Sequence, residues 1–191
     1  MVDVNVKEIL LECEAFLQGH FLLSSGKHSN GYVQCAKLLQ WPDRAEKVLS
    51  VVKDQVKDLG IETVIGPAMG GIVVSYELGR QLGVKSIFTE RENDVMTLRR
   101  GFTVKENEKV LITEDVVTTG KSSLETIEAL KDYGVEVVGI ACIANRSGKD
   151  NLNGYKIYPA ISLDIDTYES DNCPLCKENI ELVKPGSRKK F

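Results

Sequence analysis

Along most of the chain, stretches with apolar residues at helical spacing alternate with short runs of consecutive apolar residues. Three valines between Val48 and Val56 are spaced by four, which predicts an amphipathic helix that begins near Pro42 and closes at Gly60. A short apolar run over residues 63–65 follows and is typical of a buried strand. Helices that alternate with strands predict an α/β fold, in which a parallel twisted sheet is flanked by helices on both faces. The further predicted helices lie around residues 74–82 and 124–130, and the further strands over 85–89, 109–113, 135–144 and 157–165.

The amino-terminal stretch has a pattern of its own. Apolar residues recur there at spacings of three and four, which predicts a helix over residues 6–17, capped by Asn5 with Glu8 and ended by Gly19. Two short extended pieces are predicted next, on either side of a polar turn at residues 24–31.

Composition narrows the class of protein. Of the 191 residues, 42% are hydrophobic and 27% are charged, a balance typical of a globular domain and not of a disordered or fibrous chain. The formal net charge of −4 argues against a general nucleic-acid-binding protein. No apolar run approaches the ~20 residues that a membrane span needs. Asp3 and Glu8 interrupt the apolar residues at the amino end, which argues against a signal peptide. We therefore expect a cytoplasmic protein with no membrane partner.

The five cysteines are an odd number and are expected to stay reduced. Only Cys173 and Cys176 have the spacing of metal ligands, and a zinc site normally takes four ligands. No second pair with this spacing exists. Two interpretations stay open: two free thiols near a turn, or a structural metal completed by Cys35, a histidine or a partner chain.

The most informative stretch runs from Val110 to Ser122. An apolar strand ends in two adjacent acids, Glu114 and Asp115, and a turn rich in hydroxyl groups and glycine then opens a helix. Backbone N–H groups at a helix N-terminus favour a phosphate. Carboxylates suit instead the hydroxyl groups of a sugar, or a magnesium ion bound through water. These residues indicate a ligand site at the carboxyl edge of the sheet, where α/β folds bind their ligands.

A Walker A loop is the obvious alternative, because Gly120, Lys121 and Ser122 match the end of that motif. The motif requires a glycine five positions before Gly120, where this chain has Asp115. A carboxylate at that position would repel the phosphates that the loop binds. We therefore exclude a Walker A site.

The same stretch resembles the phosphoribosyl pyrophosphate signature of type I phosphoribosyltransferases. In that family the turn holds the 5-phosphate and the acids hold the ribose 2- and 3-hydroxyls; the first acid is often aspartate where this chain has Glu114. Residues 66–71 resemble the family's pyrophosphate loop, whose small residues let backbone amides approach the diphosphate. The resemblance implies catalytic roles for Glu114 and Asp115, and Mg²⁺ held by Asp115 through water. The implied phosphoribosyl pyrophosphate-binding residues of these segments are Ala68, Met69, Gly70, Gly71, Glu114, Asp115, Val116, Val117, Thr118, Thr119, Gly120, Lys121 and Ser122.

A second resemblance concerns the acceptor base. Residues 21–29 and Tyr32 resemble the amino-terminal hood of orotate phosphoribosyltransferases. Lys27 in this segment suits orotate, which carries a carboxylate. Arg146 falls where that family places an arginine on orotate, and Thr118 completes the implied orotate-binding set. The alternatives are a solvated turn lysine for Lys27 and a surface arginine for Arg146.

These resemblances extend over nearly the whole chain. They imply the type I phosphoribosyltransferase fold as a single domain over residues 1–191, with an α/β core at 41–165. Residues 1–40 and a C-terminal segment would form a small hood. The segment from Thr167 to Arg188 resembles a Thermus-type bacterial branch.

Residues 90–101 correspond to a mobile loop that closes over the pyrophosphate in this family, often from the neighbouring subunit, and supplies a lysine. This chain has no lysine there. Arg91 stands near the usual position of that lysine, and the resemblance implies a catalytic role for it. Arg99 and Arg100 add positive charge for phosphoribosyl pyrophosphate, since arginine binds phosphate oxygens in a forked geometry. A solvated hairpin is the alternative. The resemblance also implies a homodimer in which this loop reaches the neighbouring site.

The predicted reaction is transfer of the phosphoribosyl group from phosphoribosyl pyrophosphate to orotate, with no nucleic-acid partner. Two alternatives stay open: a phosphoribosyltransferase for another base, such as a purine, and a non-enzymatic regulator that keeps the fold and binds nucleic acid. Lys27 and Arg146 argue against a purine base.

His20 and His28 are the only histidines, and no G-x-S-x-G motif accompanies them, which argues against a serine hydrolase. His28 is expected either to contact substrate or to lie on the surface. The four basic residues of the short tail are too few for a nucleic-acid face: Lys184, Arg188, Lys189 and Lys190.

Overall fold

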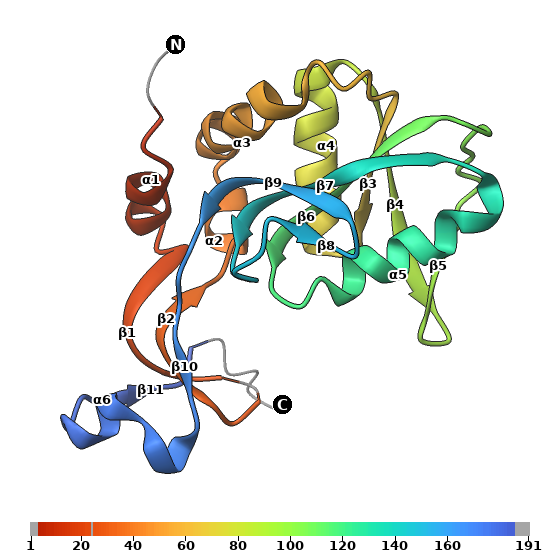
Figure 1. Ribbon diagram of the computed structural model, residues 1–191. Coiled ribbons are helices and arrows are strands. Elements are labelled where there is room, and N and C mark those ends of the chain that lie inside the picture. Colours follow the sequence, from red (N-terminus) through yellow and green to blue (C-terminus); the bar gives the residue numbers. More distant parts are fainter. Residues whose placement is uncertain (1–3, 24, 186–191) are drawn as a thin grey trace.

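A computed structural model describes residues 4–23 and 25–185, which form two separate β-sheets (Figure 1). Ser24 of the predicted polar turn, and Arg188, Lys189 and Lys190 of the basic tail, lie outside the described residues. None of the helices in the described part is both long and apolar enough to cross a membrane.

The large sheet has seven strands in the order β5-β4-β3-β6-β7-β9-β8. The five strands from β4 to β9 run parallel, and the short edge strands β5 and β8 are antiparallel to their neighbours. The α/β prediction with a parallel sheet is confirmed. The strand bounds are β3 (Thr63–Pro67), β4 (Lys85–Glu92), β5 (Val95–Leu98), β6 (Lys109–Val117), β7 (Glu136–Asn145), β8 (Asn151–Leu152) and β9 (Tyr155–Ser162).

Helices cover both faces of this sheet because its central strands are apolar on both sides (Figure 1). On one face, Leu111 of β6 belongs to a core with α3 (Pro42–Val56) and α4 (Gly70–Leu82). On the other face, the next residue, Ile112, packs in a second core with α5 (Lys121–Leu130). A short 3-10 helix (Lys131–Tyr133) continues α5 up to Gly134, so the helical segment ends before this glycine, as predicted.

The amino-terminal helix is shorter than predicted. Helix α1 (Val6–Glu12) begins at Asn5, whose side chain accepts the Glu8 N–H at 3.2 Å, so the predicted cap is confirmed. The helix ends five residues early, because the backbone at Glu14 is left-handed and residues 16–22 form a strand, β1. Gly19 lies within that strand and does not end a helix. Pairing with the following strand overrides the helical spacing here.

The second, small sheet has the order β10-β2-β1-β11. It joins the hairpin of β1 (Phe16–Leu22) and β2 (His28–Val33) to two strands from the other end of the chain, β10 (Thr167–Tyr168) and β11 (Leu182–Val183) (Figure 1). Strand β2 therefore contains much of the segment predicted as a polar turn, which is a correction. The short helices α2 (Ala36–Leu39) and α6 (Pro174–Lys177) and a 3-10 helix (Ser170–Asn172) complete the described elements.

Two strands of the large sheet run further than predicted. Strand β6 continues through both acids to Val117, where pairing with β7 extends as far as Asn145. Strand β3 continues to Pro67 and α4 begins at Gly70, so the predicted loop over residues 66–71 is reduced to two residues. Both segments reach the carboxyl edge of the sheet, where the candidate site lies.

Candidate active site

The two acids lie on consecutive residues at the carboxyl end of β6 and are each half-buried. The Glu114 carboxylate accepts the Asp115 N–H at 3.1 Å, and the Asp115 carboxylate accepts the Val116 N–H at 2.8 Å. These contacts occupy one oxygen of each carboxylate, and the two carboxyl groups are also close enough to hydrogen-bond to each other when Glu114 is protonated. Burial and the neighbouring Asp115 charge raise the pKa of Glu114 to about 8. Such a pair favours a ligand that brings hydrogen-bond donors or positive charge.

The start of α4 approaches the acid pair closely. Gly70 has no room for a side chain, because a Cβ there would lie 2.5 Å from the Asp115 carboxylate. The loop before it consists of Ala68 and Met69, joined by a cis peptide, and the Ala68 N–H donates to the Thr89 carbonyl of β4 at 2.8 Å. The small residues of the predicted pyrophosphate loop therefore bring the α4 N-terminus against Asp115.

The turn between β6 and α5 encloses a small pocket. Gly120 adopts a left-handed conformation (φ +72°) that lets the chain turn into α5. Ser123 was not among the predicted residues; its Oγ is buried and lacks a hydrogen-bond partner in the described part of the chain. A ligand oxygen in the pocket would satisfy that hydroxyl. The pocket has a volume of about 80 Å³ and is lined by Glu114, Val116, Thr118, Thr119, Gly120, Lys121, Ser122 and Ser123.

Cys35 lies against the backbone of Asp115. Its Sγ is 3.6 Å from the Asp115 carbonyl, and the side chain is 1% exposed. Burial, with the charge of Asp115 and other neighbours, raises the pKa of this thiol well above its usual value, so it stays protonated. Cys35 is not near Cys173 and Cys176, and the possibility that it completes a metal site with them is wrong.

Arg146 directly follows β7, at the same edge of the sheet. Its backbone N–H donates to the Val117 carbonyl at 2.8 Å, which fixes it beside the end of β6. The side-chain Nε is buried and has no hydrogen-bond partner among the described residues, and burial lowers the pKa of the guanidinium. An open pocket of about 580 Å³ adjoins it, lined also by Ser147, Asp164 and Ile165. A half-buried cation whose buried Nε is an unused donor indicates an anionic ligand.

Lys27 lies in the turn of the small sheet, apart from the acid pair. Its Nζ forms an ion pair with Glu169 at 2.6 Å, and both side chains are about half exposed or more. Glu169 follows β10, so this pair joins the β1–β2 hairpin to the C-terminal segment.

The segment over residues 90–101 forms a hairpin of β4 and β5. Arg91 donates to the Asp94 carbonyl at 3.0 Å and pairs with Glu125 of α5. The two other arginines pair within the hairpin: Arg99 with Glu92 at 3.1 Å, and Arg100 with Glu90 at 3.0 Å. The positive charge expected of this loop is thus balanced by carboxylates in the isolated chain.

Comparisons with known proteins place these features in a family. A family model for the phosphoribosyl transferase domain matches residues 34–169. An orotate phosphoribosyltransferase from Caldicellulosiruptor bescii is 53% identical over 183 residues, which cover 96% of both chains. The chain belongs to the orotate phosphoribosyltransferase family.

Solved structures of related proteins share the fold of this family member. The orotate phosphoribosyltransferase of Aeropyrum pernix has a TM-score of 0.68 at 24% identity, over 83% of this chain and 93% of that one. That of Mycobacterium tuberculosis, solved with phosphoribosyl pyrophosphate, has a TM-score of 0.66 at 22% identity, over 83% and 95%. The UMP synthase of Leishmania donovani has a TM-score of 0.69 at 23% identity over 85% of this chain, which spans 37% of that one.

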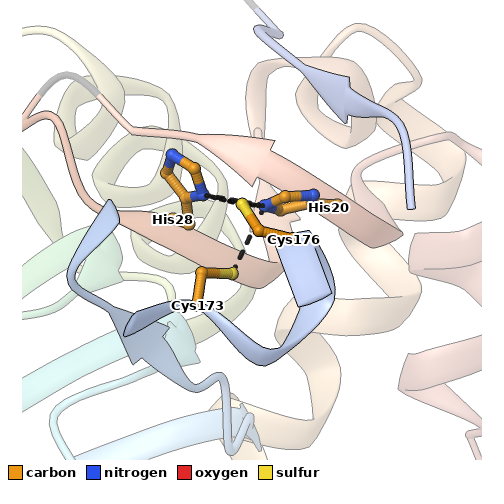
Figure 2. Close-up of side chains that lie close together, drawn as sticks. All are labelled: His20, His28, Cys173 and Cys176. Carbon is orange, nitrogen blue, oxygen red and sulfur yellow. Dashed lines mark hydrogen bonds between the residues drawn. The ribbon is translucent and has the colours of Figure 1, made fainter. Parts of the chain in front are cut away.

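The sequence left open that a histidine completes a metal site with Cys173 and Cys176, but it did not identify the cluster that the structure brings together. His28, expected to contact substrate or lie on the surface, is buried in β2 at 6% exposure, so the surface alternative is wrong. It lies against His20, Cys173 and Cys176 (Figure 2). The only sequence signal was the spacing of the two cysteines, because the histidines are separated from them by more than 140 residues.

Proposed function

We propose that the protein transfers the phosphoribosyl group of phosphoribosyl pyrophosphate to orotate, giving orotidine 5′-monophosphate and pyrophosphate in pyrimidine biosynthesis. A ring nitrogen of orotate attacks C1 of the ribose, and the bond from C1 to the diphosphate oxygen breaks. The observation that carries the proposal is the half-buried pair Glu114 and Asp115, held between the pocket of the following turn and the N-terminus of α4.

The turn from Thr118 to Ser122 would bind the 5-phosphate. The support is the pocket at the N-terminus of α5, where backbone N–H groups favour an anion, together with the unsatisfied buried hydroxyl of Ser123. Val116 would contribute as part of the lining of this pocket, and the buried Val117 by fixing the end of β6 against Arg146.

The acids would hold the ribose hydroxyls through the second oxygen of each carboxylate. This geometry fixes C1 relative to the base and is the main contribution of these residues to the rate. The carboxylate oxygens also fit Mg²⁺, a hard cation that prefers oxygen ligands and keeps several waters. When bound with the substrate, Mg²⁺ would neutralise charge on the departing diphosphate.

The diphosphate would lie against Ala68, Met69, Gly70 and Gly71, where the two glycines let α4 begin tightly against Asp115 and the N-terminus of the helix favours an anion. Arg91, Arg99 and Arg100 would close over it by exchanging their carboxylate partners for phosphate oxygens. The pair of Arg99 with Glu92 is exposed, and exposed pairs contribute only about 0–1 kcal/mol each, so the exchange costs little there. Glu125 and Glu90 are partly buried, so the diphosphate would have to compensate a stronger pair at Arg91 and Arg100.

Orotate would bind near Arg146, whose buried Nε has an unused donor, with Thr118 beside it at the end of β6. We further propose that the small sheet forms the hood over this base and that Lys27 faces the orotate carboxylate when the site is occupied. The charge of orotate and the pairing of Lys27 with Glu169 support this exchange.

The protein is proposed to act in the cytoplasm as a homodimer in which the 90–101 hairpin reaches the neighbouring site. Three large apolar side chains at the start of α4 support a second subunit there: Met69 is 82% exposed, Val73 44% and Tyr76 70%. Their spacing of four and three puts them on one face, next to the candidate site. The five free cysteines fit a reducing compartment.

The test is release of pyrophosphate with orotate, phosphoribosyl pyrophosphate and Mg²⁺, with each omitted in turn. We expect turnover only with all three present. Turnover with adenine or guanine but not with orotate would instead support the purine alternative. Tight binding of nucleic acid at physiological salt without turnover would support the regulator.

A further inference from the structure

Four side chains of the kind that bind zinc converge at the small sheet. His20 on β1 and His28 on β2 face Cys173, which precedes α6, and Cys176 within it (Figure 2). One ligand atom from each residue can be chosen so that all four lie within 4.8 Å of one another. Three of the residues are buried and Cys176 is exposed. The cluster lies outside the candidate active site.

The separations between ligand atoms fit a tetrahedral ion. Zn–S bonds of about 2.3 Å and Zn–N bonds of about 2.0 Å place the ligand atoms of a tetrahedron roughly 3.3 to 3.8 Å apart. The sulfur-to-nitrogen separations are 3.4 Å from Cys173 to His20 Nε2 and 3.3 Å from Cys176 to His28 Nδ1. Cys176 is also 3.8 Å from His20 Nε2. The two nitrogens, at 2.8 Å, must separate slightly to admit an ion, and the widest pair of ligand atoms, within 4.8 Å, must draw closer.

The second ring nitrogen of His20 is fixed by the backbone. Its Nδ1 lies 2.8 Å from the carbonyl oxygen of Ile180, which can only accept a hydrogen bond. Nδ1 therefore carries the proton, and the lone pair of a neutral His20 is on Nε2, directed into the cluster. This arrangement, a ligating histidine whose other nitrogen donates to a carbonyl, is typical of protein metal sites.

Hydrogen bonds among the four groups would leave them poorly satisfied. The Nε2 of His20 has one lone pair but three neighbours, His28 Nδ1, Cys173 Sγ and Cys176 Sγ. It can accept a good hydrogen bond from only one of them. A cation at the centre would use a lone pair from each of the four residues at once.

We propose that His20, His28, Cys173 and Cys176 bind one structural Zn²⁺ ion. Two histidines and two cysteines, the latter with two residues between them, form a closed set of four ligands with no position left for substrate. The ion would fasten the β1–β2 hairpin to the C-terminal segment, in addition to short strand pairings, the Lys27–Glu169 ion pair and hydrogen bonds from Ser29 and Asn30 to Asp166. Binding energy of this kind is folding energy for a small region with little apolar core.

The site also bears on the base-binding hood, a consequence that rests on the proposed function. Lys27 immediately precedes His28, and its partner Glu169 lies four residues before Cys173. The metal would therefore fix both partners of this ion pair, and so the position of Lys27 above the base.

Metal content is the direct test. The protein is produced with added zinc, purified under reducing conditions without chelator, and measured by inductively coupled plasma mass spectrometry. We expect about one zinc ion per chain in the wild type and less than about a tenth of that in Cys176→Ser and His28→Ala. Cys13→Ser is the matched control: Cys13 is a buried cysteine outside the cluster, and its contact with Arg44 can be kept by a serine hydroxyl.

A second measurement covers variants that do not fold. Wild-type protein is stripped with a strong chelator and titrated with Co²⁺ alone. We expect the visible absorption of tetrahedral cobalt with a thiolate charge-transfer band, and restoration by Zn²⁺ of the melting temperature that the chelator lowered. Wild-type protein with no more zinc than Cys176→Ser, or a Cys173–Cys176 disulfide in place of metal, would overturn the site.

The metal measurements do not depend on catalysis. If zinc is bound but orotate is not turned over, the proposed function fails and the metal site stands. If turnover is normal in a protein that binds no zinc, the metal site fails and the proposed function stands. With both intact, removal of zinc should raise the KM for orotate more than the KM for phosphoribosyl pyrophosphate.

Discussion

The two sheets of this protein are stabilised in different ways. In the large sheet, Leu111 and Ile112 of β6 are fully buried on opposite faces, between helices. In the small sheet, both residues of β11 are more than 40% exposed, and its buried side chains are partly polar. They are Phe16, His20, Phe21, His28, Ser29 and the nearby Cys173. Apolar packing holds the first sheet, whereas specific polar contacts between distant segments hold the second.

This difference matches the proposed division of work. The ribose and phosphate would bind at the edge of the rigid sheet, where small errors in position cost most in rate. The base would bind under the small sheet, whose contacts are more exposed. Substitutions can separate the two roles.

The largest expected effect is on activity, at the large sheet. Asp115→Asn replaces one carboxylate oxygen with an amide nitrogen, which cannot accept a hydrogen bond from a ribose hydroxyl. Hydrogen bonds to a charged group contribute about 1.5–3 kcal/mol, so we expect turnover to fall by on the order of a hundredfold. The melting temperature should stay close to that of the wild type, because Asp115 is only half-buried.

Asp54→Asn, an exposed substitution in α3, is the control for the loss of charge. Steady-state kinetics and a thermal melt on both variants decide the outcome. Near wild-type turnover in Asp115→Asn would contradict the ribose-binding role.

The next effect concerns stability and compares the sheets directly. Leu111→Ala removes a fully buried side chain from the large sheet and should lower the free energy of unfolding by about 2–5 kcal/mol. Leu182→Ala removes a side chain that is 41% exposed in β11 and should cost about 1 kcal/mol or less. Urea denaturation of both variants measures the difference. Equal losses would show that apolar packing stabilises both regions alike.

The large sheet is the part that the sequence could predict. Its helices and strands follow apolar spacing, and its site residues from Glu114 to Ser122 are contiguous, so that a local motif reports them. The extent of β6 was missed because pairing with β7 carries the strand through two acids that would suit a loop. Local spacing cannot report a neighbouring strand whose paired residues lie nearly thirty positions away, as Glu114 and Cys142 do.

The small sheet could not be predicted because it also depends on pairing between distant segments, which here come from the two ends of the chain. The helical spacing of residues 6–17 continues across Phe16 and Leu17, which instead pair with Val33 and Tyr32 as strand β1. His20 meets Cys173 only because β10 and β11 return to the hairpin. Ser123 was missed because it follows the motif and is recognisable only by its buried, unsatisfied hydroxyl.

An effect of intermediate size, on stability, is expected when Glu108 is substituted. This residue lies at the opposite end of the large sheet from the candidate site. Its buried carboxylate accepts hydrogen bonds from Thr63, from Lys85 at 2.9 Å and from the Lys105 N–H at 2.7 Å. Burial alone would raise the pKa of Glu108, but these donors outweigh it and hold the pKa below its usual value. Glu108→Gln should lower the free energy of unfolding at neutral pH by roughly 1–3 kcal/mol.

The sign of the pH effect follows from that shift. Because the folded protein holds this carboxyl ionised more strongly than the unfolded chain does, its contribution is complete above the ordinary pKa of a glutamate. It is lost as the pH falls through the lower, folded value. Chemical denaturation between neutral and acid pH should therefore give a smaller loss in Glu108→Gln than in the wild type. Glu106→Gln, exposed and two residues away, should keep the wild-type slope; an identical slope in all three proteins would contradict the assignment.

The smallest expected effect is at the small sheet and concerns one substrate only. Lys27→Met should raise the KM for orotate by about two- to fivefold, the equivalent of up to about 1 kcal/mol for one exposed ionic contact, and leave the KM for phosphoribosyl pyrophosphate and the stability nearly unchanged. Lys37→Met is the matched control, since Lys37 is equally exposed and also pairs with one glutamate, Glu14 at 3.2 Å. Initial rates at varied orotate and fixed saturating phosphoribosyl pyrophosphate measure the effect. If both variants behave alike, Lys27 serves only to join the hairpin to Glu169, and the small sheet does not recognise the base through this side chain.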